Sequence, residues 1–429
     1  MKYNFLGKSD LKVSNYCLGT MTYGEQTSEM DAHLQMDKAF DSGINFFDTA
    51  EMYSTCPRLA ETAGKTEQII GTWIKKNPTL RNKLILATKI IGNGDTFIRD
   101  GGPINRKSLK IALETSLKRL QTDYIDLYQL HWPNRGSYHF RKNWDYNPSD
   151  GNKNEVENDI LEIVEALYDF KSEGKIRAFG LSNETCWGVT KYVDAVKKFE
   201  NFPVASIQNE YSLLCRLYDT DMNEMSYYEN IPLLAYSPLA GGLLTGKYLN
   251  DEMPTDSRIT RVSTIGDRVN INAMKAVQEY IKISKKFNIH PVHLALAFCT
   301  KRPFMGSVIF GATTDEQLDV VIKGLDVDLN DEVMEEIHSK SDCYVSFSSS
   351  EGVGMGAVEA SLRNKPVIIT DYGGATEYIE TPYTINCELQ KLPADDFLYK
   401  RSYRNCQKIR GKTFSHQRTY NLVNYRMCS

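Results

Sequence analysis

The sequence predicts an α/β protein built on a (β/α)8 TIM barrel that is preceded by a β-hairpin. Short β-rich apolar runs alternate along the chain with segments of helical periodicity, which is typical of a parallel sheet joined by crossover helices. Eight such strand–helix units fit into about 320 residues, the size of a TIM barrel with loop insertions. An open doubly wound sheet would show the same alternation, but the glycine-rich turn expected after its first strand is missing.

The individual elements can be placed from the same patterns. The expected strands are Cys17–Thr20, Ile44–Thr49, Leu84–Lys89, Ile125–His131, Ala178–Ser182, Ser206–Glu210, Leu233–Ser237 and Ser307–Phe310. Apolar residues at three-and-four spacing predict an amphipathic helix over Arg106–Gln121. Ahead of the first strand, Tyr3–Leu6 and Leu11–Val13 flank a turn-forming group, so we expect a β-hairpin that covers the bottom of the barrel.

Composition and charge exclude several classes of protein. With 429 residues, 41% of them hydrophobic and 25% charged, the chain has the balance of an average globular protein. No apolar run reaches the roughly 20 residues that span a bilayer, and the N-terminus lacks a signal-peptide pattern, so a cytoplasmic protein is expected. The nine cysteines form no CxxC pair or His/Cys cluster, which argues against a disulfide framework or a metal site. A net charge of −4 is a poor match for nucleic acid.

The character of the sequence changes near Asp342, which divides the chain into three expected parts. Residues 1–340 are expected to form the barrel, and residues 341–400 read as strand, glycine-rich turn, helix and strand, a small partial Rossmann-like fragment. The segment from Lys400 to Ser429 carries eight Lys or Arg residues and no acid. We therefore expect residues 401–429 to be a basic, poorly ordered tail.

Four polar side chains fall at the predicted C-terminal ends of neighbouring strands, where a barrel gathers its functional groups. Asp48 ends the second strand and Tyr53 follows it, while Lys89 ends the third and His131 the fourth. Tyrosine, with an unperturbed pKa near 10, becomes an effective acid only beside a cation. Lys89 can supply that charge and Asp48 can hold it, while His131 orients a substrate carbonyl. Each residue alone could be structural, but their convergence favours a proton-donating site.

The longest predicted loop, Pro133–Asn154, follows the strand that ends in His131. Loops at this end of a barrel commonly select the substrate. The aromatic residues Tyr138, Trp144 and Tyr146 therefore suggest an aromatic-lined pocket, although they could instead pack the loop against the barrel.

Several motifs fall in order on these strands, among them INFFDTAEMY, LKRLQTDYIDLYQLHWP, GKIRAFGLSNET and LLAYSPLAGGLLTGKYL. From Met1 to about Lys340 the sequence resembles the aldo-keto reductases, most closely their bacterial Tas-like branch. The resemblance implies NADPH-dependent reduction of a small aldehyde or ketone to an alcohol by hydride transfer. It places the catalytic tetrad of that family on Asp48, Tyr53, Lys89 and His131, with Tyr53 as the general acid.

The resemblance also implies a nicotinamide cofactor and the residues that hold it. Residues that match those around the nicotinamide are Ser182, Asn183, Gln208 and Tyr236. Those that match the rest of the cofactor site are Ser237, Leu239, Gly241, Lys247, Arg258, Gly311, Thr313 and Gln317. Among these, Lys247 and Arg258 match basic residues near the adenosine phosphate, and two such cations favour NADPH over NADH. Where related proteins place a Glu and an Asn against the adenosine, this chain has Val320 and Val321, which could simply pack the last barrel helix.

Two alternative functions remain open at this stage. Some relatives with this barrel are regulatory subunits, so a non-catalytic nicotinamide-binding redox sensor is one alternative. The C-terminal part resembles the donor-binding half of a retaining glycosyltransferase, because Glu351 and Glu359 have the E-x7-E spacing of that family. Only a fragment of about sixty residues is present, however, without an acceptor domain, so sugar transfer is the less favoured alternative.

Overall fold

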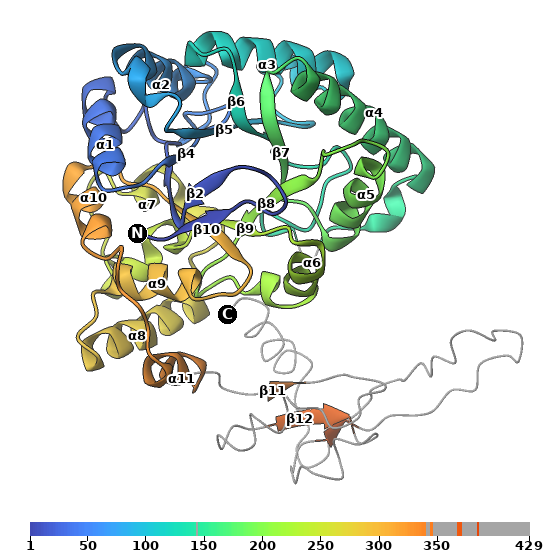
Figure 1. Ribbon diagram of the computed structural model, residues 1–429. Coiled ribbons are helices and arrows are strands. Elements are labelled where there is room, and N and C mark those ends of the chain that lie inside the picture. Colours follow the sequence, from blue (N-terminus) through green and yellow to red (C-terminus); the bar gives the residue numbers. More distant parts are fainter. Residues whose placement is uncertain (143–144, 340–343, 346–366, 371–383, 386–429) are drawn as a thin grey trace, which may run out of the picture. The chain divides into compact units, whose positions relative to one another are not determined.

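The computed structural model describes residues 1–142, 145–339, 344–345, 367–370 and 384–385 (Figure 1). The chain divides into two compact units, Met1–Leu329 and Asn330–Ser429. Glu351, Glu359 and residues 401–429, for which the sequence raised expectations, lie outside the described residues.

The first unit is a closed barrel of eight parallel strands, as the sequence predicts (Figure 1). The strands follow one another around the barrel in chain order, and the last pairs with the first. They are β3 (Tyr16–Gly19), β4 (Phe46–Asp48), β5 (Ile85–Ile90), β6 (Ile125–Leu130), β7 (Ile176–Ser182), β8 (Val204–Glu210), β9 (Leu233–Tyr236) and β10 (Met305–Phe310). Their ends differ from the predicted ones by two residues or fewer, because ladder hydrogen bonds set strand ends more sharply than an apolar pattern does.

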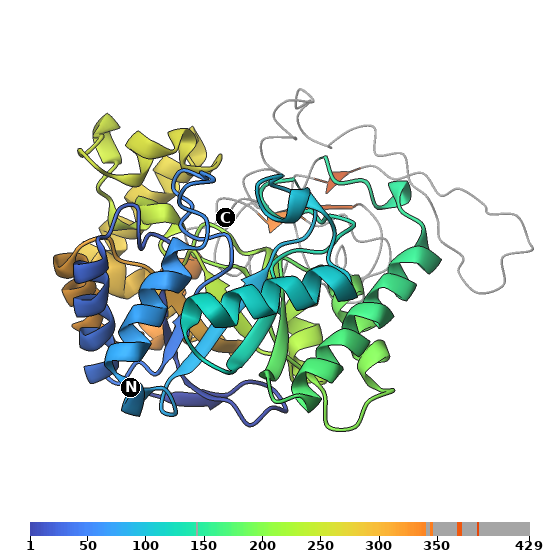
Figure 2. The ribbon, with the colours of Figure 1, turned by 90° about the horizontal axis from the view of Figure 1, so that it is seen from above.

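Helices lie along the outside of the strands (Figures 1 and 2). In the first unit they are α1 (Glu29–Asp41), α2 (Lys65–Lys76), α3 (Arg106–Leu120), α4 (Lys153–Ser172), α5 (Cys186–Val196), α6 (Asp221–Glu229), α7 (Arg258–Arg261), α8 (Ile271–Lys286), α9 (Pro291–Thr300) and α10 (Asp315–Ile322). The helix predicted over Arg106–Gln121 is α3. Asn105 caps its N-terminus in a capping box with Ser108, and Gln121 ends it in the left-handed region with φ 52°.

The N-terminal hairpin closes one end of the barrel, as expected. Strands β1 (Tyr3–Phe5) and β2 (Lys12–Ser14) pair antiparallel. Leu6, Leu11 and Val13 are fully buried in one cluster with residues of the barrel strands, including Phe46 and Leu127. The hairpin therefore fills the end of the barrel opposite the loop insertion that follows β9 (Figure 2).

The described residues of the second unit form helix α11 (Asp331–Ser339) and three short parallel strands. Strand β11 (Tyr344–Val345) pairs with β12 (Val367–Thr370), which pairs with β13 (Thr384–Ile385). A small parallel sheet is the core that a partial Rossmann-like fragment requires. Across the described residues, no helix is both long and apolar enough to cross a membrane.

Candidate active site

The loops at the C-terminal ends of the barrel strands enclose a cavity of about 1430 Å³. Most ligand sites occupy about 300–1,000 Å³, so this one can hold a large cofactor together with a small molecule. Of the sixteen residues assigned from the sequence to catalysis or cofactor binding, fourteen line it: Asp48, Tyr53, His131, Asn183, Gln208, Tyr236, Ser237, Leu239, Gly241, Lys247, Arg258, Gly311, Thr313 and Gln317. The other two, Lys89 and Ser182, lie behind the wall, with exposed fractions of 0% and 1%.

Lys89 is sealed between Asp48 and Tyr53. Its Nζ donates to Asp48 Oδ1 at 2.5 Å and to the carbonyl oxygen of Thr49 at 2.8 Å, and it lies 4.9 Å from the centre of the Tyr53 ring. Burial lowers the pKa of Lys89, but the charges of Asp48 and Tyr53 and hydrogen bonds to both residues together outweigh burial, so the pKa is raised above its ordinary value. The lysine is therefore a protonated cation buried directly beside a phenol.

Two amides complete the surroundings of the Asp48 carboxylate. Gln129 Nε2 and Gln208 Nε2 each donate to Asp48 Oδ2 at 2.9 Å. With Lys89 on Oδ1, both oxygens of this buried carboxylate are satisfied, which is the condition for keeping a charge inside a protein. Gln208, which the resemblance assigns to the cofactor amide, thus also orients Asp48.

The rings of Tyr53 and His131 contact each other edge to face, and both line the cavity. Their ring centroids are 5.8 Å apart, with an interplanar angle of 78°. Burial raises the pKa of Tyr53, while the charge of Lys89 and a hydrogen bond to it act in the opposite direction. Burial, together with the charges of Lys89 and Arg58, holds the pKa of His131 well below its usual range. The imidazole is therefore neutral at physiological pH, and its Nδ1 has no partner among the described residues.

The end of β7 carries a hydrogen-bonded group that fixes one amide in the cavity wall. Asn183, with φ 51°, donates from Nδ2 to the carbonyl oxygen of His131 at 2.9 Å and accepts from the Tyr236 hydroxyl at 2.8 Å. Ser182 Oγ donates to the backbone carbonyl of Gln208 at 2.8 Å and accepts from Asn183 Nδ2 at 3.1 Å. Ser182 therefore positions Asn183 from behind.

After β9 the chain makes a tight turn. Ser237, Ala240, Gly241 and Gly242 all have positive φ, and the N–H groups of Ala240 and Gly242 donate to the carbonyl oxygens of Ser237 and Leu239. Glycine is required at 241, since a Cβ there would come within 2.3 Å of the Ile265 side chain.

Lys247 and Arg258 lie beside this turn, and both line the cavity. The Lys247 side chain lies against Gly242, where an added Cβ would be 3.2 Å from Lys247 Cε. Arg258 Nε is buried and has no hydrogen-bond partner, and within the described residues neither cation forms an ion pair. A buried donor left free by the protein is suited to a ligand that brings its own negative charge.

The last part of the cavity wall follows β10. Gln317 Oε1 accepts from the backbone N–H of Thr313 at 3.0 Å and from its hydroxyl at 3.1 Å. Val320 and Val321 both line the cavity, but Val321 is 3% exposed and belongs to the buried core. Val321 therefore packs in the core and also borders the cavity.

The aromatic residues that line the cavity are not those that the loop sequence suggested. Tyr138 and Tyr146 contact each other, with ring centroids 6.5 Å apart, and neither lines the cavity, while Trp144 lies outside the described residues. Trp132 and Phe140 line it instead and pack edge to face at 5.9 Å. Phe140 has φ 58°, a backbone state that its residue type does not signal.

The loop after β6 is bound to the end of β7 by side chains. Ser137 Oγ donates to the carbonyl oxygen of Asn183 at 2.8 Å, and the Arg135 guanidinium forms a two-pronged ion pair with Glu184. His139 Nε2 lies 3.1 Å from the carbonyl oxygen of Glu184 and donates to it. The loop is therefore held in place before any ligand binds.

Acid should weaken this attachment through His139. Burial lowers the pKa of His139 from 6.5 to about 4. The unfolded chain therefore binds more protons between these values, and the free energy of unfolding falls as the pH drops from about 6.5 to about 4. Over this pH range, the free energy of unfolding measured with denaturant should fall by on the order of 2 kcal/mol more in the wild type than in His139→Gln. The glutamine amide can still donate to the carbonyl oxygen of Glu184. Equal falls in the two proteins would contradict this role.

The fold and the cavity together define the class of protein. It is a (β/α)8 barrel that gathers a buried cation, a phenol, a neutral imidazole and a glycine-containing turn at the C-terminal ends of its strands, which is where enzymes of this fold carry their active sites.

Comparison with known proteins identifies the family. The sequence profile of the Aldo/keto reductase family matches residues 15–342, and the chain belongs to this family. It is 43% identical to Protein tas of Escherichia coli K12 over 351 residues, 80% of this chain and 99% of that protein. It is 33% identical to the uncharacterized oxidoreductase YrpG of Bacillus subtilis, over 78% of this chain and 94% of that protein. A probable voltage-gated potassium channel subunit beta of Arabidopsis thaliana is 29% identical, over 76% and 92%.

A second profile, that of glycosyl transferases group 1, matches residues 325–386. The resemblance of the C-terminal part to glycosyltransferases is thereby confirmed for that short stretch.

Proposed function

We propose that this protein reduces an aldehyde or ketone to an alcohol with NADPH, and that Tyr53 is the general acid. The observation that carries the proposal is the protonated Lys89, which is buried between Asp48 and Tyr53, while both of these residues line a large cavity. A structural ion pair has no need of a phenol beside its lysine at the cavity wall. A proton donor does, because the cation stabilises the phenolate that remains after transfer.

Each of the four residues has a separate task. Tyr53 gives its proton to the substrate oxygen as negative charge develops there, and Lys89 stabilises the resulting phenolate. Asp48, held by two glutamine amides, keeps Lys89 charged and in position. His131 is neutral, so it donates a hydrogen bond to the carbonyl oxygen without competing with Tyr53 as the acid. NADPH, when bound, supplies the hydride that adds to the carbonyl carbon.

We assign the cofactor-binding residues along the cavity wall in the order that the family resemblance implies. Around the nicotinamide we assign Ser182, Asn183, Gln208 and Tyr236, with Ser182 acting through Asn183. Along the pyrophosphate and adenosine we assign Ser237, Leu239, Gly241, Lys247, Arg258, Gly311, Thr313 and Gln317. The free donor of Arg258 supports a phosphate on the adenosine, and hence NADPH over NADH.

We also place the enzyme in the cytoplasm, where thiols stay reduced, since the five cysteines in the described residues are all free.

The test is NADPH and NADH consumption by the full chain with a panel of aldehydes and quinones. We expect steady turnover with NADPH and much weaker use of NADH. Arg258→Ala should raise the Kd for NADPH by about 10- to 100-fold, because a hydrogen bond to a charged group contributes about 1.5–3 kcal/mol. The Kd for NADH, measured on the same variant, should change by less than about threefold. No turnover with any carbonyl, or an equal loss for both cofactors, would count against the proposal.

The redox-sensor alternative is supported by the similarity to proteins described as voltage-gated potassium channel subunits beta. The same assay separates the two. A sensor would bind NADPH and oxidise it at most once, whereas a reductase would continue until the carbonyl or the NADPH is consumed.

A further inference from the structure

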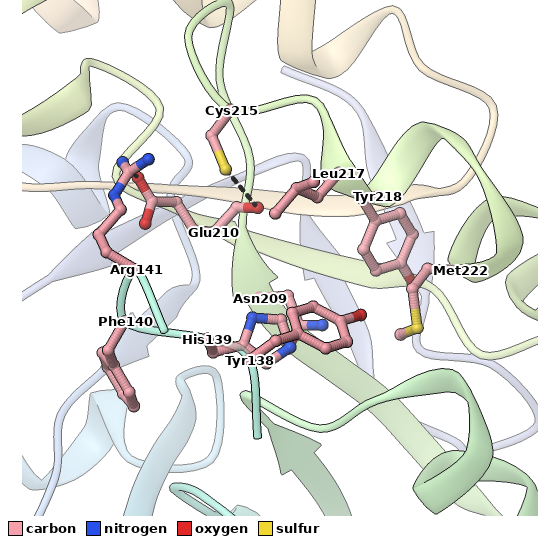
Figure 3. Close-up of a pocket in the computed structure, with 10 residues that line it drawn as sticks. All are labelled: Tyr138, His139, Phe140, Arg141, Asn209, Glu210, Cys215, Leu217, Tyr218 and Met222. Atoms are coloured by element: carbon pink, nitrogen blue, oxygen red, sulfur yellow. Dashed lines mark hydrogen bonds and ion pairs between the residues drawn. The ribbon is translucent and has the colours of Figure 1, made fainter. Parts of the chain in front are cut away.

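The buried carboxylate of Glu210 forms ion pairs with arginines from two different loops of the cavity, although Glu210 itself does not line the cavity. Glu210 is the last residue of β8 and is 8% exposed. Its Oε1 accepts from Arg141 Nη2 at 2.7 Å and from Arg268 Nε at 2.9 Å, and its Oε2 accepts from Arg268 Nη2 at 3.0 Å. Figure 3 shows Arg141 directed at this carboxylate. The two arginines belong to different loops.

Arg141 belongs to the loop after β6 and directly follows Phe140. Phe140 lines the cavity and packs against Trp132, which contacts His131 with ring centroids 4.9 Å apart. Arg141 itself has φ 67°, so the ion pair holds this segment in an unfavourable backbone state. The ion pair between Glu210 and Arg141 therefore fixes the part of the cavity wall that lies beside His131.

Arg268 belongs to the insertion after β9 and fixes the other wall. Its Nη1 donates to the carbonyl oxygen of Ile265 at 2.9 Å, and the Ile265 side chain abuts Gly241 in the turn after β9. The same insertion carries Arg258, assigned above to the adenosine phosphate. The pair between Glu210 and Arg268 thus holds the segment assigned to the adenosine end of the cofactor.

We propose that Glu210 is a positioning residue that holds the substrate-side and cofactor-side loops in place together, so that binding at either end of the cavity depends on one carboxylate. This role rests on the proposed function. A single carboxylate between two guanidiniums makes the dependence strong, because losing it leaves two largely buried cations without their shared partner.

The test compares Glu210→Gln with a matched control, Asp126→Asn. Asp126, on β6, is also a buried carboxylate shared by two arginines, Arg81 and Arg177, but it lies near the start of its strand, at the opposite end of the barrel. In the cofactor-free full chain, hydrogen exchange should speed up in residues 135–142 and 263–270 together in Glu210→Gln, and in neither segment in Asp126→Asn. This readout does not depend on turnover, so it separates failure of this inference from failure of the proposed function.

The ligand constants then distinguish positioning from a merely structural role. In Glu210→Gln, the Kd for NADPH and the KM for the aldehyde should both rise by about tenfold, while kcat at saturation stays within about twofold, because Glu210 does not touch the reacting atoms. Arg141→Met should loosen only residues 135–142, which keeps the inference testable if Glu210→Gln does not fold. The inference is overturned if only one loop or one ligand responds to Glu210→Gln, if Arg141→Met leaves exchange unchanged, or if Asp126→Asn has the same effects.

Discussion

Tyr53→Phe is expected to lower kcat for aldehyde reduction by about a thousandfold, within the range that a positioned general acid contributes. The change removes only the hydroxyl that faces the cavity beside Lys89. The ring remains to pack against His131, and every residue assigned to the cofactor is unchanged. The Kd for NADPH should therefore stay within about threefold of the wild-type value.

The measurement is steady-state turnover together with NADPH binding followed by fluorescence. Tyr138→Phe is the matched control, because it removes a hydroxyl from the mouth of the same barrel but from a residue that does not line the cavity. Its kcat should remain near the wild-type value. If Tyr53→Phe kept more than a tenth of the wild-type kcat, Tyr53 would not be the acid.

The tetrad positions could be predicted because a barrel is a strong geometric constraint. Once β4, β5 and β6 are known to be parallel neighbours, their C-terminal ends must lie side by side, and Asp48, Lys89 and His131 sit at or next to those ends. The closed strand order, the hairpin and the cavity-lining positions follow from the same constraint together with the family resemblance.

What the sequence did not predict depends on loop conformation and side-chain reach. Nothing local to Phe140 or Arg141 signals a positive φ, so the sequence did not single out Phe140 as a residue that lines the cavity. The link from Glu210 to Arg268 spans 58 positions in the chain, and only the folded insertion brings the two together. A buried Glu at the end of a barrel strand was the one available signal, because such a residue needs a cationic partner.

Lys89→Met is expected to remove both activity and stability, and the two losses should be separable. Without the lysine, the buried Asp48 carboxylate keeps only its amide donors, and an ion pair broken on one side inside a protein costs about 3–5 kcal/mol. Tyr53 also loses the cation that lowers its pKa, so kcat should fall by at least about a hundredfold. Denaturant unfolding and turnover on the same preparation measure both effects.

The double variant Asp48→Asn with Lys89→Met tells the two roles apart. Removing both charges leaves no unpaired ion, so most of the lost free energy of unfolding should return. Turnover should not return, because the phenol still has no cation beside it. If the double variant regained activity along with stability, Lys89 would act only by supporting the fold, and the proton-donating site proposed here would be wrong. If stability stayed low while the chain still bound NADPH, the Asp48–Lys89 pair would contribute to the fold through contacts other than its charge.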